Sequence, residues 1–150
     1  MADKIEILDE FGEVLKTFKA REGQDGIEGV SWEGEFLFGA QLAGANFKGA
    51  DLYSASFTEA KLDGANFEGA LLQGADLTDA SCIGASFRKA DLGRDSFGRS
   101  ARLQGANLTK AILNRAKLDG TEYDDRTLFP KGFHPSSHGM IETETENPDD

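Results

Sequence analysis

A period of five residues governs the middle of this 150-residue chain. From residue 40 to residue 99 the chain reads AQLAG ANFKG ADLYS ASFTE AKLDG ANFEG ALLQG ADLTD ASCIG ASFRK ADLGR DSFGR. After one extra residue at Ser100, the period resumes and continues from residue 101 to residue 130. Three weaker repeats, DGIEG VSWEG EFLFG, precede it in the same register. We call the central large apolar residue of each repeat position i and number the other positions from it.

Neither an amphipathic helix, with its spacing of about 3.6 residues, nor a flat strand, with its spacing of two, accounts for this period. A unit of five residues is too small to bury an apolar face alone, so it must stack on its neighbours. The period therefore predicts a solenoid.

A second period, of twenty residues, indicates how the units stack. Residues of similar kind recur at this spacing in four sets: Phe47, Phe67 and Phe87; Leu52, Leu72 and Leu92; Leu42, Leu62 and Cys82; and Phe57, Leu77 and Phe97. These sets predict a coil of four pentapeptides with four faces, in which each i residue packs on the i residue of the coil below. With the extra residue at Ser100, the columns continue to Leu103, Leu108, Leu113 and Leu118.

The repeats ANFKG, ADLYS, ANFEG, ADLTD and ANLTK follow the pattern A(D/N)LXX, which resembles the tandem repeats of the pentapeptide-repeat family. The resemblance covers about two thirds of the chain. It implies an all-β fold, a right-handed quadrilateral β-helix, in which the side chains at i and i−2 point inward and the other three point outward. Since successive coils lie about 4.8 Å apart, about five coils form a rod about 25 Å long.

The residue types at each position agree with this geometry independently. Alanine at i−2 is small enough to turn inward, and burying each Leu or Phe at i contributes about 1.5–3 kcal/mol. Stacked phenylalanines add about 0.5–1.5 kcal/mol per pair. Asn, Asp and Ser at i−1 can hydrogen-bond the nearby backbone, and Gly at i+2 permits a positive φ.

A stack of coils exposes apolar side chains and unpaired backbone groups at both ends, so caps are expected there. We divide the chain into an N-terminal cap (1–24), the repeat β-helix (25–130) and a C-terminal segment (131–150), which contains the end of a lid followed by an acidic tail. In the first segment, apolar residues at 5 and 7 and at 14 and 15 flank a turn around residues 10–12, which predicts a hairpin. A capping helix is the alternative, because the apolar residues from 11 to 18 also fit helical spacing, although Gly12 disfavours a helix.

The run TEYDDRTLFPKGFHP (121–135) loses the alanine and gains larger apolar residues and prolines, which suit a lid that stops further strand pairing. This run is similar to the closing segment of many pentapeptide-repeat proteins. The sequence beyond it, IETETENPDD, is acidic and polar and is predicted to be disordered.

Composition limits the functional classes. No apolar run approaches the roughly eighteen residues of a membrane span, and the N-terminal MADKIEILDE lacks a basic region followed by an apolar stretch. We therefore expect a cytoplasmic protein that does not bind membranes. The single cysteine, Cys82, occupies an inward i position and is interpreted as a core residue rather than a reactive thiol.

Signatures of catalysis are nearly absent. His134 and His138 have a spacing that would suit a metal on a helix, but a proline separates them and no cysteine or carboxylate cluster lies nearby in the sequence. Outward Asp and Glu residues recur on all faces, and phosphate-loop, dinucleotide and nucleophile-elbow motifs do not occur. We expect no enzyme activity, no metal and no cofactor.

The net charge of −11 invites comparison with family members that resemble DNA in shape and charge and bind DNA gyrase. A duplex mimic should line its rod with negative charge, since DNA carries one charge per roughly 1.7 Å of axis. Here residues 1–39 carry −6 and residues 131–150 carry −4, whereas residues 40–130 carry only −1. The gyrase-directed members also tend to carry loops that emerge from the coil, and this sequence indicates only the one-residue insertion near Ser100. Both observations weaken this interpretation, so a DNA-mimicking regulator of gyrase or topoisomerase is the alternative function and not the main prediction.

Charge is also segregated along the repeats. The charged residues between 50 and 79 are acidic apart from Lys61. A basic belt occupies residues 88–117 and consists of Arg88, Lys89, Arg94, Arg99, Arg102, Lys110, Arg115 and Lys117. This basic belt could contact an acidic partner or a nucleic-acid backbone, and an ordinary solvated surface accounts for it as well. No aromatic residues interleave with it outside the core columns, so direct nucleic-acid binding is not expected.

Outward positions with apolar side chains are the remaining candidates for contact. Leu71 and Ile112 occupy i−1 and Tyr53 occupies i+1, all assigned to the face whose interior column is Leu52, Leu72, Leu92 and Leu113. Scattered apolar surface residues are also normal. The main prediction is a non-enzymatic scaffold or protein-interaction module with an unidentified protein partner. Caps at both ends favour a monomer, and an imperfect lid would permit an end-to-end dimer.

Overall fold

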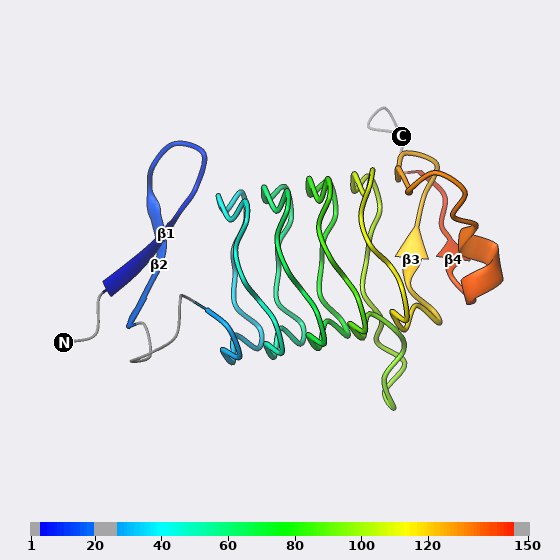
Figure 1. The fold of residues 1–150 in the computed structure, drawn as a ribbon, viewed down its shortest axis with the longest axis horizontal. Helices are drawn as coiled ribbons and strands as arrows, with labels where there is room; N and C mark the ends of the chain where they lie inside the picture. Colours follow the sequence, from blue (N-terminus) through cyan, green and yellow to red (C-terminus); the bar gives the residue numbers. More distant parts are fainter. Residues whose placement is uncertain (1–3, 20–26, 146–150) are drawn as a thin grey trace.

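The computed structural model describes residues 4–19 and 27–145 of the chain. From residue 31 onward, the chain winds as a four-sided coil whose short bridges are all parallel. Up to Leu71 with Asp91 these bridges join residues twenty positions apart, as in Asp51 with Leu71 and Asn66 with Ser86, whereas the four from Asp76 with Arg102 to Asp91 with Lys117 join residues farther apart. The amides of the i residues that stay in the coil from Trp32 to Leu108 donate to carbonyls of the next coil, for example from Phe67 to Ser86 over 2.7 Å. The coils are stacked along one axis (Figure 1), and backbone hydrogen bonds join each coil to its neighbour.

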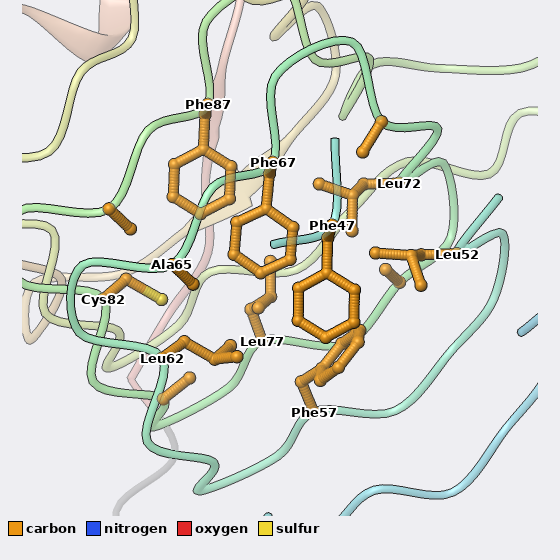
Figure 2. Packing of buried hydrophobic residues seen from close by; sticks show 14 of the residues in the cluster. Phe47, Leu52, Phe57, Leu62, Ala65, Phe67, Leu72, Leu77, Cys82 and Phe87 are labelled. Atoms are coloured by element: carbon orange, nitrogen blue, oxygen red, sulfur yellow. The ribbon is translucent and has the colours of Figure 1, made fainter. Parts of the chain in front are cut away.

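Two positions of each repeat point into the coil and form its core. The buried i residues include Phe47, Phe67 and Phe87 in one column, Leu52, Leu72 and Leu92 in the next, and Leu42, Leu62 and Cys82 in another. The ring centres of Phe47 and Phe67 lie 5.0 Å apart and those of Phe67 and Phe87 4.9 Å apart, with nearly parallel planes (Figure 2). The alanines at i−2 are buried beside these columns. Ile27, Trp32 and Leu37 are buried too, so the weaker repeats share the register.

A tight turn follows each i residue. In this turn the alanine that opens the next repeat donates its amide to the i carbonyl, as Ala70 does to Phe67 over 3.0 Å. The residue at i+2 adopts a positive φ, which glycine does without steric cost, as Gly69 does at 67°. Non-glycine residues also adopt a positive φ at this position: Ser54, Glu59, Asp79, Lys89, Lys110 and Arg115. The regular turns of the coil therefore impose this conformation on residues other than glycine as well.

The coil is interrupted at residues 95–100, and this interruption is longer than the sequence indicated. The Ala101 amide donates to the Leu92 carbonyl over 2.9 Å, which is the bond that residue 95 would otherwise form. Residues 95–100 therefore leave the coil as a loop, which protrudes from one edge (yellow-green in Figure 1). Phe97 is 80% exposed, so its assignment to a core column was wrong.

The cause of the interruption is the residue at i−2. In DSFGR this inward position holds Asp95 instead of alanine. Burying even a neutral polar group without a partner costs about 2–7 kcal/mol, and a carboxylate costs more. Burying Phe97 would return only about 1.5–3 kcal/mol. The balance favours expelling the whole repeat.

The loop displaces every later repeat by one face relative to the sequence prediction. Asp76 bridges Arg102, so Leu103 continues the column of Leu77 rather than that of Cys82. A further irregularity follows residue 123, because Asn107 bridges Leu128 one position later than the period requires. Leu128 consequently faces outward, and its neighbour Phe129 packs against the core.

At the N-terminal end, strands β1 (Lys4–Leu8) and β2 (Val14–Lys19) form an antiparallel hairpin, as in the first of the two alternatives, and not a helix. The Gln41 amide donates to the Leu8 carbonyl over 2.8 Å, and the Phe18 and Trp32 rings meet edge to face at 5.1 Å. The hairpin therefore packs on the end of the apolar columns (Figure 1). Residues 20–24 of the predicted cap lie outside the described residues.

At the C-terminal end, strand β3 (Glu122–Tyr123) pairs in parallel with β4 (Ile141–Glu142), and the short 3-10 helix η1 (Pro135–His138) lies between them in sequence. Aromatic rings follow one another in this segment with centres 4.6–5.4 Å apart: Tyr123, Phe129, Phe133 and His138. The prediction that disorder begins at Ile141 was wrong, because Ile141 and Thr143 donate their amides to carbonyls of the preceding coil. Residues 146–150 of the predicted tail lie outside the described residues.

Replacing Phe67 with alanine should lower the free energy of unfolding by about 3–5 kcal/mol, because Phe67 is fully buried between two stacked rings. Phe97→Ala is the matched control and should change it by less than about 0.5 kcal/mol, because Phe97 lies at the surface. Urea unfolding followed by circular dichroism measures both values. Equal losses in the two variants would contradict the exclusion of residues 95–100 from the coil.

Candidate functional site

The three contact residues predicted from the sequence do not share one wall. We name each wall by an i residue behind it, so the Leu72 wall presents Asp51, Leu71 and Asp91, which bridge one another. Leu71 is 46% exposed there. Ile112 bridges Ser86 and therefore lies on the adjacent Phe67 wall, where it is 44% exposed. The prediction that these three residues share one face was wrong, because the loop shifts Ile112 to another wall.

Tyr53, the third predicted residue, binds within the chain and anchors the loop. Its phenol donates a hydrogen bond to the Asp95 carboxylate. The Arg99 guanidinium lies over its ring, with the central carbon 4.7 Å from the ring centre. Tyr53 thus joins the Leu72 side of the coil to both ends of the loop.

Asp95 also organises the loop from inside. Its Oδ1 accepts the amides of Phe97 at 2.9 Å and Arg99 at 2.8 Å, and its own amide donates to the Arg99 carbonyl at 2.9 Å. Its Oδ2 accepts the Arg99 Nε at 3.2 Å. At the far end of the loop, Ser100 donates its hydroxyl to the Gly120 carbonyl at 2.6 Å. In a core column this carboxylate would be buried without a partner. In the loop it is still only 12% exposed, but it is fully paired and forms the centre of a closed turn.

These bonds shift the protonation of the Tyr53–Asp95 pair. The Tyr53 hydrogen bond, supported by the Arg99 and Phe97 amides and the Arg99 charge, lowers the pKa of Asp95 to about 2. The same bond raises the pKa of Tyr53, because it favours the protonated phenol. The carboxylate is therefore ionised, and the phenol is the donor, throughout the neutral range.

The loop displays Phe97, which reasoning from the sequence placed in the core. Arg99 also stacks on the Phe97 ring, with 5.0 Å between its guanidinium carbon and the ring centre. Aspartate at i−2 was the signal that could have identified this loop. Phe36 and Phe38 are two further exposed aromatic residues at outward positions, and the criterion that selected Leu71 would have found them.

The basic belt is partly neutralised in the structure. Lys117 lies 4.0 Å from Asp91, Arg99 lies 3.2 Å from Asp95, and Arg102 lies between two carboxylates. The other members form no ion pair with any residue in the described part of the chain: Arg88, Lys89, Arg94, Lys110 and Arg115. They are distributed over several corners of the coil, so the belt is not one continuous contact surface.

Residues 4–19 and 27–145 contain no group of three or more His, Cys, Asp or Glu side chains that could hold a metal. His138 stacks on Phe133 at 4.6 Å. Burial raises the pKa of the Cys82 thiol to about 12, so it stays protonated. Within the same residues, no helix has the length and apolar character needed to cross a membrane.

The family model described as pentapeptide repeats matches residues 37–74, 55–94 and 99–122. A search of the curated proteins found no match. Among solved structures, a pentapeptide repeat protein from Nostoc PCC 7120 is 33% identical, with 75% of this chain and 84% of that chain covered and a TM-score of 0.42.

Two other solved structures are similar to the chain. HetL, a pentapeptide repeat protein involved in heterocyst differentiation regulation in Nostoc sp. strain PCC 7120, is 30% identical, with a TM-score of 0.44. The alignment with HetL covers 69% of this chain and 50% of HetL. QnrB1, a plasmid-mediated fluoroquinolone resistance protein, is 16% identical over 79% of this chain and 84% of QnrB1, with a TM-score of 0.36.

Replacing Tyr53 with phenylalanine should raise the pKa of Asp95 toward its ordinary value, because the largest cause of the depression is removed. Because the pKa of Asp95 is lower in the folded chain than in the unfolded chain, where it is about 3.9, the ionised carboxylate stabilises the folded loop at pH values above about 3.9. That contribution is lost as the pH falls through about 2, and the loss should move to higher pH in the variant. Carboxyl NMR titration of Asp95 measures the shift. An unchanged titration would show that the phenol does not bind Asp95.

Proposed function

Because this chain belongs to the pentapeptide-repeat family, we propose that it is a non-enzymatic protein-interaction module whose docking element is the loop at residues 95–100. Its coil is a mostly non-helical fold that matches right-handed quadrilateral β-helix structures. A regular coil presents similar polar side chains on every wall, so specificity for a partner must come from departures from the repeat. The exposed Phe97 at the loop is the observation that carries this proposal.

An exposed phenylalanine on a loop held by the protein is well suited to anchor an interface. A few aromatic and arginine side chains provide most of the binding energy of protein interfaces. Phe97 and Arg99 lie side by side on this loop. Asp95, Tyr53 and Ser100 already hold the loop by hydrogen bonds, so little conformational entropy is lost when a partner binds.

Leu71 extends this docking surface. It lies on the Leu72 wall, three residues before Gly74, where a Cβ atom would lie 3.7 Å from the Cβ atom of Arg99 in the loop. Tyr53 contributes by holding the loop and not by exposing its own ring. Ile112 lies on another wall and is left out of the docking surface.

We also propose that the chain catalyses no reaction. Several carboxylates pair with basic residues, as the exposed Asp79 and the buried Asp124 do with Arg126, and are therefore poorly placed as general acids or bases. The buried thiol of Cys82 is unsuited to nucleophilic attack. We propose a cytoplasmic monomer with a protein partner, without a metal, a cofactor, a membrane or direct nucleic-acid binding. The hairpin and the aromatic lid at the two ends support the monomer.

Replacing Phe97 with aspartate should abolish binding of the partner and leave the fold intact, because the Phe97 side chain is exposed and does not pack in the core. The full-length chain is used as bait in affinity capture from its native host. We expect at least one protein to be retained by the wild type and by Ile112→Asp but lost with Phe97→Asp. Ile112→Asp is the matched control, since it places the same charge on another wall. Full retention by Phe97→Asp would reject the loop as the docking element.

A regulator of DNA gyrase is the second candidate, and the loop is the observation that favours it. Gyrase-directed members of the family tend to carry loops that emerge from the coil, and the loop at 95–100 is longer than the sequence indicated. Charge opposes this candidate. Residues 40–130 are nearly neutral, and the arginines beside the loop have the wrong sign for a mimic of duplex DNA.

We expect the full-length chain at micromolar concentration to leave gyrase supercoiling unchanged, with and without a quinolone. The chain lacks the line of negative charge that a duplex presents to the enzyme. A supercoiling assay resolved on agarose measures this outcome. Inhibition or protection that Phe97→Asp abolishes would instead identify gyrase as the partner of the loop.

A further inference from the structure

A groove of about 440 Å³ opens at the base of the loop. Three arginines from different segments line it: Arg94 before the loop, Arg99 within it and Arg102 after it. Ser54, Gly74 and Ser100 contribute polar groups, Ile141 contributes an apolar side chain, and Glu122 is its single acidic lining residue in the described chain. Phe97, the docking anchor proposed above, does not line the groove, although Arg99, which stacks on Phe97, does.

The guanidinium groups of Arg94 and Arg99 have N–H donors that bind no acceptor in the described part of the chain. The Arg94 guanidinium lies against Gly120, where a Cβ atom would come within 2.8 Å of its Nε and 2.9 Å of its Nη2. Arg94 forms no ion pair with any residue that the structure describes. Arg99 binds Asp95 through Nε, which leaves both of its terminal nitrogens for another acceptor. Two guanidinium groups are thus available to one ligand.

The loop also leaves a backbone donor without its usual partner. At equivalent turns the i+2 amide donates to the carbonyl one coil further on, as Ser54 does to Gln73 at 3.0 Å and Gly69 to Arg88 at 3.0 Å. Within the described residues, the Gly74 amide forms no such bond, because the chain leaves the coil just beyond its expected acceptor. The Ser54 hydroxyl lies beside it, 2.9 Å from where a Gly74 Cβ would be. An amide and a hydroxyl therefore supplement the two arginines.

Acidic groups near the groove do not cancel these donors. Glu122 lies 3.7 Å from Arg102, and Asp76 lies 3.9 Å from the same guanidinium, so both carboxylates are associated with Arg102. Asp95 directs its oxygens to Tyr53, Arg99 and the loop amides. Arg94, the free edge of Arg99, the Gly74 amide and the Ser54 hydroxyl remain for a ligand.

We propose that this groove binds a phosphate monoester. Arginine forks match the oxygens of phosphate through paired charge-assisted hydrogen bonds, and two forks suit a dianion better than a single carboxylate. Free backbone amides near such charges add further donors to an anion site. The groove volume falls within the range of about 300–1,000 Å³ found for small-molecule sites, so the organic part of the ester has room beside Ile141.

Titration of the 15N-labelled full-length chain with inorganic phosphate, glycerol phosphate and acetate at constant ionic strength tests this site. We expect saturable shifts of the Gly74 amide with both phosphates, and tighter binding of the ester. Arg94→Gln should weaken glycerol phosphate about tenfold, because a charge-assisted pair of hydrogen bonds is lost. Arg94→Lys should rescue only part of the affinity, since lysine keeps the charge without the fork. Ser54→Ala should weaken binding by a smaller factor.

Arg88→Gln is the matched control, because it removes one positive charge from a neighbouring corner outside the groove. Equal weakening by Arg88→Gln and Arg94→Gln would overturn the site, as would acetate binding as tightly as phosphate or the absence of saturation. A phosphoserine peptide tested in parallel identifies the source of the monoester: tighter binding than glycerol phosphate assigns it to a protein. Phe97→Ala removes the exposed ring without placing a charge beside Arg99, so it should weaken partner capture and leave phosphate binding unchanged. This result would separate the phosphate site from the docking anchor.

Discussion

The fold depends on a small side chain at i−2, because this residue must turn into the coil at the start of each side. Alanine fills the position, as Ala65 does. Threonine fits where its hydroxyl finds a carbonyl, as Thr121 does with Leu92 at 2.8 Å. A carboxylate does not fit within the stack, where no water or partner reaches it. Glu35 holds the position only in the first coil, where it extends to Lys16 of the hairpin at 2.7 Å.

Asp95 is where this constraint fails inside the stack, and both candidate sites follow from that failure. Expelling one repeat exposes Phe97 and leaves the Gly74 amide without its acceptor. It also brings the arginines on either side of the loop to one groove. The same carboxylate then stabilises the loop that it creates, by accepting bonds from Tyr53 and from the loop amides. A single substitution in the repeat thus produces a display loop and an anion groove.

Most of the fold could be predicted because each repeat contains its own packing signal. The columns through Phe67, Leu72 and Cys82 follow from spacing alone, and all three side chains are buried. Phe97 and Leu128 were misplaced because each is an apolar residue at the right spacing. Spacing does not report whether the neighbour at i−2 tolerates burial. The loop and the groove were largely missed for the same reason. Of their residues, the sequence indicated functional roles only for Tyr53, as a partner contact, and for the arginines, as part of the basic belt.

The sequence by itself determined the five-residue unit, the twenty-residue coil and membership of the family, because these depend on local patterns that recur many times. Only the tertiary structure decided which segment leaves the coil, which wall carries Ile112 and which donors share the groove. These features depend on the register between residues twenty or more positions apart. That register is set by a competition between burying Phe97 and burying Asp95, and the greater desolvation cost of the carboxylate decides it.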